Sequence, residues 1–107
     1  MRIVRYGIYW VSLDPTIGRE QQKTRPCVVV SPDAMHQTGM AVVCPLTSKL
    51  HPNWAHRLQI VCAGKRAEIM ADQIRAVSLA RFGAFIQKLP ASRIAQLQDI
   101  LTRLYGM

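Results

Sequence analysis

A polar loop at residues 18–26 carries the side chains best suited to phosphate chemistry. Its charged groups are one carboxylate, which can accept a proton, and three cations: Glu20, Arg19, Lys23 and Arg25. Acid–base catalysis needs a proton acceptor, and stabilisation of developing negative charge needs a fixed cation. Pro26 restricts the backbone next to Arg25 and so fixes the direction of that side chain. We interpret the segment as a functional loop; the alternative is a solvated loop whose charges keep the protein soluble.

Strands are expected to hold this loop, because the runs on either side of it are apolar. Runs of β-branched, aromatic and apolar residues, bounded by turn residues, predict strands at 3–13, 27–31, 40–45, 58–62, 67–71, 74–77 and 84–89. Short helical turns are expected at 33–36 and 78–81. Pro45 indicates an edge or bulged exit from its strand. That exit would bring the hydroxyls of Thr47 and Ser48 to the rim of the sheet.

One helix is expected, opened by Pro90 near the C-terminus. Its apolar residues recur at steps of three and four along one face: Ile94, Leu97, Leu101 and Leu104. Asp99 and Arg103 are spaced as a surface ion pair, and Gly106 suits the residue just beyond the helix end. Many short strands and one terminal helix predict a small barrel of the α+β class.

The length and charge of the chain limit the classes of partner. The 107 residues correspond to a single domain spanning 1–107. Fourteen Lys and Arg residues against six Asp and Glu give a net charge of +8. This charge favours a polyanionic partner, and nucleic acid is the first candidate. The basic residues are spread along the whole sequence, so folding has to assemble any basic patch.

The cysteine pattern is typical of a reducing compartment. Three cysteines occur without a Cys-x-x-Cys pair: Cys27, Cys44 and Cys62. This pattern argues against a disulfide framework and against a zinc site of the usual spacing, and it predicts buried free thiols. No apolar run reaches 18 residues, and polar residues interrupt the N-terminal run at 5–7. We therefore expect no membrane span, no signal peptide and a cytoplasmic location.

A second loop, at residues 49–57, mixes cations, histidines and an indole. Trp54 can stack on an unpaired base while Lys49 and Arg57 meet phosphates, which is a sequence-tolerant way to bind single-stranded RNA. The alternative is that Trp54 caps the barrel.

Three motifs follow one another along most of the chain. The first contains Ile8 to Thr16, Gly18, Glu20-Gln21, Arg25-Pro26 and Val28 to Pro32; the others are Val43-Cys44-Pro45-Leu46-Thr47-Ser48 and Asp72-Gln73-Ile74-Arg75. Their order and spacing resemble the MazF/PemK family of toxins. The resemblance implies a Src-homology-3-like barrel that forms a homodimer. It also implies a metal-independent endoribonuclease (an mRNA interferase) that cuts single-stranded RNA through attack of a 2′-hydroxyl, and an acidic antitoxin that inhibits it.

The resemblance also suggests roles for individual residues. Arg25 resembles the family's catalytic arginine and Thr47 its functional threonine, which Ser48 would assist. Glu20 matches an acid–base position, although it could instead anchor Arg25 or Lys23. The resemblance gives Asp72 a possible base role, and RNA-binding residues are expected at Arg19, Lys23, Lys49, Trp54, Arg57 and Gln73. The chain departs from the family pattern at Met70, which replaces an arginine, at Arg19, which replaces a histidine, and at Tyr6-Gly7.

Two other functions fit the same sequence. One is a basic barrel that binds nucleic acid without cutting it, and the other is a toxin of the same fold that acts on a protein such as gyrase. None of the histidines, His36, His51 and His56, matches a catalytic position of the family. The acidic residues are few and scattered, so no metal site and no cofactor are expected.

Overall fold

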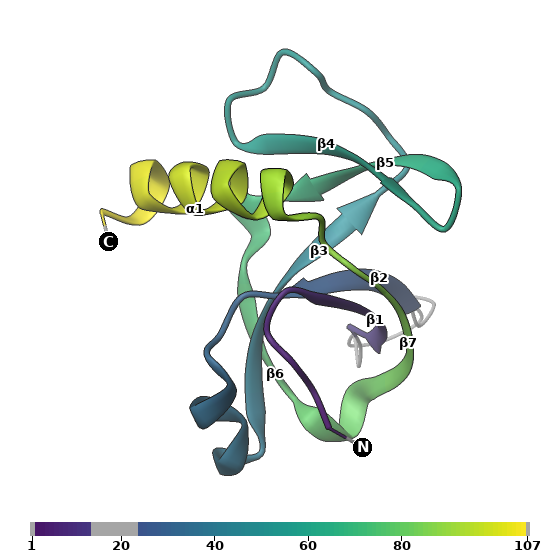
Figure 1. Cartoon of the computed structure of the whole chain (residues 1–107), viewed down its shortest axis with the longest axis vertical. Coiled ribbons are helices and arrows are strands. Elements are labelled where there is room, and N and C mark those ends of the chain that lie inside the picture. The colour runs from purple at the N-terminus through teal and green to yellow at the C-terminus, as the bar shows by residue number, and fades with distance from the viewer. Residues whose placement is uncertain (1, 14–23, 107) are drawn as a thin grey trace, which may run out of the picture.

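An antiparallel sheet and one C-terminal helix form the described chain, which covers residues 2–13 and 24–106 in the computed structural model. The strands are β1 (Gly7–Ser12), β2 (Thr24–Val29), β3 (Met40–Thr47), β4 (Arg57–Cys62), β5 (Lys65–Met70), β6 (Arg75–Ser78) and β7 (Phe82–Lys88). They lie in the order β4-β5-β3-β2-β1-β7, and β6 pairs with β3 (Figure 1). The sheet curls into a half-barrel, which confirms the expected α+β class with a small barrel and a terminal helix.

Strand β3 joins the β4–β5 pair to the rest of the sheet. Its first half, Met40 to Val43, pairs with β6, and its last two residues pair with β5. Along its other edge it pairs with β2. Pro45 lies where the partner changes from β6 to β5 and pairs with neither of them, so its missing N–H breaks neither ladder. The strand therefore continues through the proline to Thr47, two residues beyond the expected end.

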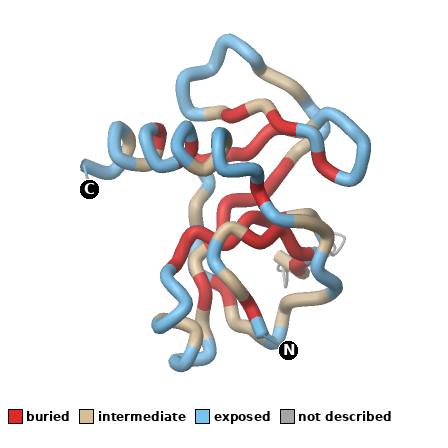
Figure 2. Tube along the Cα trace, viewed as in Figure 1, coloured by how far each residue is buried: buried red, intermediate tan, exposed pale blue. Residues whose placement is uncertain are grey.

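The central strands are buried on both faces, because alternate side chains point to opposite sides. Ile8, Val28 and Cys44 pack in one cluster, and Tyr9, Cys27 and Val43 pack in another. The first cluster includes buried residues of α1 and β4, and the second includes buried residues of β1 and β6. Figure 2 shows the buried positions gathered along the middle of the sheet. This two-sided burial explains why the run at 27–30 is apolar at every position.

Two expected strand boundaries shift in ways that matter for the site. Residues 3–6 do not belong to β1, because Tyr6 has a positive φ of 66° and the Gly7 N–H donates to the Val4 carbonyl in a turn. In contrast, β2 begins three residues early, where Ser12 pairs with Thr24 and Val11 with Arg25. Arg25 is therefore a strand residue and not, as expected, a loop residue.

Short 3-10 helices connect the remaining strands at Asp33–Thr38, Ala71–Gln73 and Leu79–Arg81. The first and third correspond to the expected helical turns. The turn at 71–73 was not expected from the sequence, which suggested a nearly continuous strand there. It places Asp72 and Gln73 outside the ladder.

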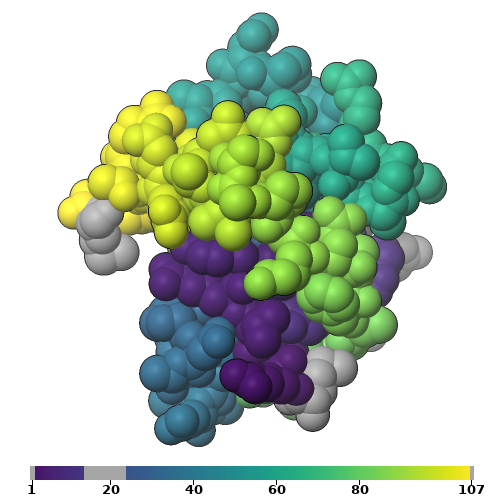
Figure 3. All heavy atoms as spheres, in the orientation of Figure 1, coloured from purple at the N-terminus to yellow at the C-terminus, as the bar shows by residue number. Residues whose placement is uncertain are grey.

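The helix α1 (Ala91–Tyr105) covers one face of the sheet. Figure 3 shows it lying next to the purple N-terminal segment and beside the teal region of β4 and β5. Leu97 and Ile100 are buried, and the Asp99 carboxylate pairs with Arg103 at 3.1 Å as expected. Gly106 ends the helix with φ 70° and donates its N–H to the Thr102 carbonyl. No helix in the described ranges is long and apolar enough to cross a membrane.

All three cysteines are buried free thiols. Burial raises the pKa of the Cys27 and Cys44 thiols to about 12, so these groups act as small apolar residues.

Candidate active site

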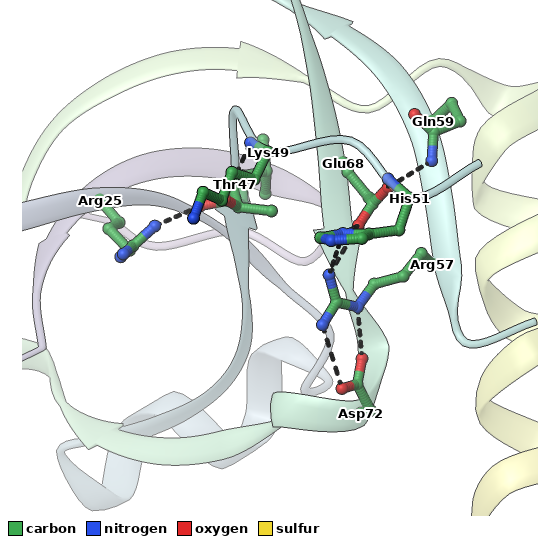
Figure 4. Close-up of polar contacts among 9 residues, drawn as sticks. Arg25, Thr47, Lys49, His51, Arg57, Gln59, Glu68 and Asp72 are labelled. Carbon is green, nitrogen blue, oxygen red and sulfur yellow. Dashed lines mark hydrogen bonds and ion pairs between the residues drawn. The ribbon is translucent and has the colours of Figure 1, made fainter. Parts of the chain in front are cut away.

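Two of the expected catalytic side chains meet at the ends of neighbouring strands. Cys27 pairs with Pro45 between β2 and β3, and continuing this register by two residues brings Arg25 opposite Thr47. The Arg25 Nη1 lies 3.5 Å from the Leu46 carbonyl, and its side chain points toward Thr47 (Figure 4). Side chains that face each other across two strands are close enough to act on one group. Arg25 and Thr47 therefore form the centre of the candidate site.

A groove of about 450 Å³ opens at this point. Besides Arg25 and Thr47, its polar and aromatic lining consists of Trp10, Thr24, Ser48, Lys65 and Arg66. A smaller hollow of about 180 Å³ shares Arg25 and Thr47 and adds Gln73 and Arg75. Arg25 and Thr47 line both spaces, so a bound strand could pass over them. Three arginines and one lysine in the two linings make this surface favourable to phosphate.

The hydroxyl of Thr47 is oriented by its own loop. The backbone N–H of Lys49 donates to Thr47 Oγ1 at 3.1 Å. Because that hydrogen bond occupies an acceptor site of the oxygen, the O–H is left to donate to a phosphate oxygen. Thr47 is partly exposed and Ser48 and Lys49 are exposed, so a ligand can reach all three.

Glu20, Arg19 and Lys23 lie outside the described residues. Their roles as acid–base and RNA-binding residues stay predictions.

Asp72 and Gln73 are neighbours in the chain but lie in different surroundings. Gln73 lines the smaller hollow beside Arg25 and Thr47. Asp72 instead pairs with Arg57, whose Nε lies 2.8 Å from the Asp72 Oδ1. Both Asp72 carboxylate oxygens contact the Arg57 guanidinium, so Asp72 is better placed to hold Arg57 than to act as a free base.

Arg57 lies in a buried ion-pair cluster and not on a phosphate-facing surface. Its side chain is only 7% exposed, and its Nη1 contacts the Glu68 Oε2 at 2.6 Å. Burial is expected to disfavour its charge, but hydrogen bonds and Coulomb attraction from Asp72 and Glu68 raise the pKa of Arg57 overall. Figure 4 shows Arg57 bridging the two carboxylates. This arrangement does not favour the expected phosphate contact.

Glu68 is the residue of the site region that the sequence did not reveal. It is fully buried on β5, directly opposite Thr47 on β3 and Gln59 on β4. Burial alone would raise its pKa, but donors from Gln59, from the His51 backbone, from Arg57 and from the His51 ring together lower it to about 2. Glu68 is therefore a charged carboxylate with every oxygen hydrogen-bonded. A signal was present, since Glu68 is the only charged residue in the run 67–71.

Trp54 is half exposed, at 50%, and packs on the same cluster. Its ring stacks on His51 with centroids 3.8 Å apart, and the Arg57 guanidinium carbon lies 4.7 Å from the indole centroid. Both expected roles of Trp54 stay predictions. In the ranges that the structure describes, no three His, Cys, Asp or Glu side chains are arranged to hold a metal ion.

Comparison with known proteins agrees with this geometry. Residues 4–105 match the family model described as PemK-like, MazF-like toxin of type II toxin-antitoxin system. The endoribonuclease PemK of Escherichia coli is 35% identical over 92% of this chain and 81% of its own length. The endoribonuclease MazF9 of Mycobacterium tuberculosis is 30% identical over 92% of this chain and 93% of its own length.

Solved structures lead to the same family. The MazE–MazF crystal structure from Deinococcus radiodurans (Form-II) is 26% identical and superposes with a TM-score of 0.86, covering 100% of this chain and 98% of that one. The same sheet and terminal helix are therefore present in both. This chain belongs to the PemK-like, MazF-like toxin family of type II toxin-antitoxin systems.

Proposed function

We propose that this protein is a toxin that cuts single-stranded RNA, with Arg25 and Thr47 acting on the scissile phosphate. The observation that carries the proposal is the meeting of these two side chains in a basic groove. Relatives that share the family are named endoribonucleases, which agrees with the same chemistry.

The groove supplies two of the groups that the reaction needs. The 2′-oxygen attacks the adjacent phosphorus and the bond to the 5′-oxygen breaks, giving a 2′,3′-cyclic phosphate and a 5′-hydroxyl. The Arg25 guanidinium stabilises the charge that builds on the phosphate oxygens, and the Thr47 hydroxyl donates to one of them. One proton leaves the 2′-hydroxyl and one reaches the 5′-oxygen. Glu20 is the proposed acid–base group for these transfers.

We expect the purified protein to cut single-stranded RNA in the presence of excess chelator. A guanidinium and a hydroxyl carry the charge stabilisation, so no divalent ion is required. A mixed-sequence RNA is incubated with the protein and EDTA, and the new ends are identified by mass spectrometry. Cyclic phosphate and 5′-hydroxyl ends support the proposal. Intact RNA, or cleavage restored only by Mg²⁺, contradicts it. Binding without cleavage would support the alternative of a nucleic-acid-binding barrel.

Replacing Thr47 with valine keeps the shape of the side chain and removes the hydroxyl. We expect kcat to fall by roughly 10- to 100-fold, the effect of one hydrogen bond to a charged group. Thr47→Ser retains the donor and is expected to keep most of the activity. Single-turnover cleavage of a short RNA measures both variants. Full activity in the valine variant together with a loss in the serine variant would mean that the threonine methyl group matters, not its hydroxyl.

The natural inhibitor is proposed to be an acidic antitoxin. The Deinococcus radiodurans relative was solved as a MazE–MazF complex, and an acidic, extended segment would compete with RNA for the cations of the groove. A homodimer and a cytoplasmic location also stay predictions from the family resemblance. Action on a protein such as gyrase is the other alternative, and it predicts growth arrest without RNA cleavage.

A further inference from the structure

The indole of Trp54 has one covered face and a large exposed surface. His51 stacks on it at 3.8 Å with only 18° between the ring planes, yet half of the residue remains accessible. The Arg57 guanidinium, 4.7 Å from the indole centroid, also lies 3.4 Å from the His51 ring and so contacts the indole from the same side, which leaves the other face and edge open to solvent. A flat, exposed π surface on a strongly basic protein is suited to stacking with a nucleobase.

The backbone around Trp54 is held by consecutive turns. The Trp54 N–H donates to the His51 carbonyl at 3.0 Å, and the Arg57 N–H donates to the Trp54 carbonyl at 3.3 Å. These bonds hold the Trp54 backbone beside the two residues that contact its ring. The loop at 48–56 is therefore ordered around Trp54.

Both residues that contact the indole are fixed by the same buried carboxylate. Glu68 accepts the His51 backbone N–H and the Arg57 Nη1, and its Oε2 also lies 3.3 Å from the His51 ring. Asp72 holds the guanidinium from its Nε side. Glu68 is fully buried, and both His51 and Arg57 are bonded to it. The orientation of the indole that they contact is therefore set before any ligand arrives.

The carboxylate that orders Trp54 lies next to the proposed catalytic threonine. Glu68 is the cross-strand partner of Thr47, and paired strands lie about 4.8 Å apart. The loop that carries Trp54 starts at Ser48, which lines the main groove. In Figure 4 the Glu68 cluster and the Arg25–Thr47 pair lie on adjoining strands. A strand of RNA crossing Thr47 thus has its neighbouring nucleotides close to this loop.

We propose that Trp54 is a rigid stacking platform for an RNA base near the cleaved phosphate, and that Glu68 is the positioning residue that holds the platform through His51 and Arg57. The proposal rests on the proposed function for the identity of the substrate. It assigns to the loop a role in affinity and sequence preference, separate from the chemical step.

The first test is cleavage kinetics with the full chain. Trp54→Ala is expected to raise KM about 10-fold, within the range known for one stacked base, while kcat changes less than about threefold. Cleavage of a randomised RNA library should lose preference at one position beside the cut. Trp54→Phe should restore part of both effects because it keeps an aromatic face. Phe85→Leu is the matched control, since Phe85 is equally exposed, at 51%, and lies outside the groove.

The second test is direct and does not require cleavage. An all-deoxy oligonucleotide lacks the attacking 2′-hydroxyl, so it binds without being cut. In a Trp10→Phe background the remaining tryptophan is Trp54, and its fluorescence should be quenched by this probe. Glu68→Gln is expected to weaken the quenching and to raise KM in the same direction as Trp54→Ala. Because Trp54 is exposed, Trp54→Ala keeps the proposal testable even if Glu68→Gln does not fold.

The outcomes separate this proposal from the proposed function. If the oligonucleotide quenches the fluorescence of Trp54 but the protein leaves RNA intact, the stacking role of Trp54 is supported and the proposed nuclease activity is overturned. If Trp54→Ala cleaves RNA with an unchanged KM and an unchanged preference in the RNA library, the nuclease activity is supported and the stacking role of Trp54 is overturned. Quenching by an acidic peptide but not by the oligonucleotide would also overturn it, since Trp54 would then belong to a protein-binding surface.

Discussion

Replacing Arg25 with alanine is expected to lower kcat for RNA cleavage by roughly 1,000-fold without unfolding the protein. The reason is that the guanidinium is the cation placed opposite Thr47, where charge builds on the phosphate. Arg25→Lys should keep much of the affinity for uncleavable RNA but lose most of the turnover, because lysine retains the charge and lacks the planar fork. Single-turnover rates and binding of a deoxy-substituted RNA measure the two effects separately.

The matched control for this pair is Arg93→Lys. Arg93 lies on α1 with its Nη1 bonded to Gln96, away from the groove, so the same chemical change there should leave kcat within about twofold. Wild-type turnover in Arg25→Lys would show that Arg25 acts only as a charge. Wild-type turnover in Arg25→Ala would remove it from the mechanism.

Glu68→Gln is expected to cost about 3 kcal/mol of unfolding free energy at neutral pH. The variant leaves Arg57 buried with one carboxylate partner, and breaking one side of a buried ion pair typically costs 3–5 kcal/mol. Urea unfolding followed by circular dichroism measures the difference. Asp99→Asn is the control, because the exposed Asp99–Arg103 pair should contribute far less.

The pH dependence of the same variant gives an independent check. Because the folded-state pKa of Glu68 is lowered from 4.5 to about 2, its stabilising contribution is complete above about pH 4.5 and is lost as the pH falls toward 2. The wild-type protein should therefore lose its advantage over Glu68→Gln across this interval. A stability gap that stays constant from pH 7 to pH 2.5 would show that the charge of Glu68 is not what stabilises the fold.

Much of the fold could be predicted because it depends on local patterns. The apolar runs and the 3.6-residue period of α1 depend on residues close in sequence. Arg25 and Thr47 could be named from motifs and strand ends. Their side-by-side arrangement could not, because it requires the β2–β3 register, which local sequence does not specify.

The cluster around Glu68 shows why the surroundings of Arg57 could not be predicted from the sequence. Glu68 receives hydrogen bonds from His51, Arg57 and Gln59, which lie 17, 11 and 9 residues away. Arg57 was expected to face phosphate because a basic residue in a polar loop usually faces solvent. Only the pairing of β4 with β5 brings a carboxylate beneath it. Long-range pairing, not composition, decides whether such a charge is free or buried.

The continuous strand β3 has a consequence for how the protein opens. Since it pairs with β2, β5 and β6 at once, separating any of these partners exposes one of its edges, and only global unfolding frees the whole strand. Its central amides should accordingly be among the slowest to exchange with deuterium. The Thr47 hydroxyl, which is proposed to bond the scissile phosphate, thus stands at the end of the strand that opens last. Substitutions in the 48–56 segment should therefore change which RNA is bound while the backbone beneath Thr47 stays constant.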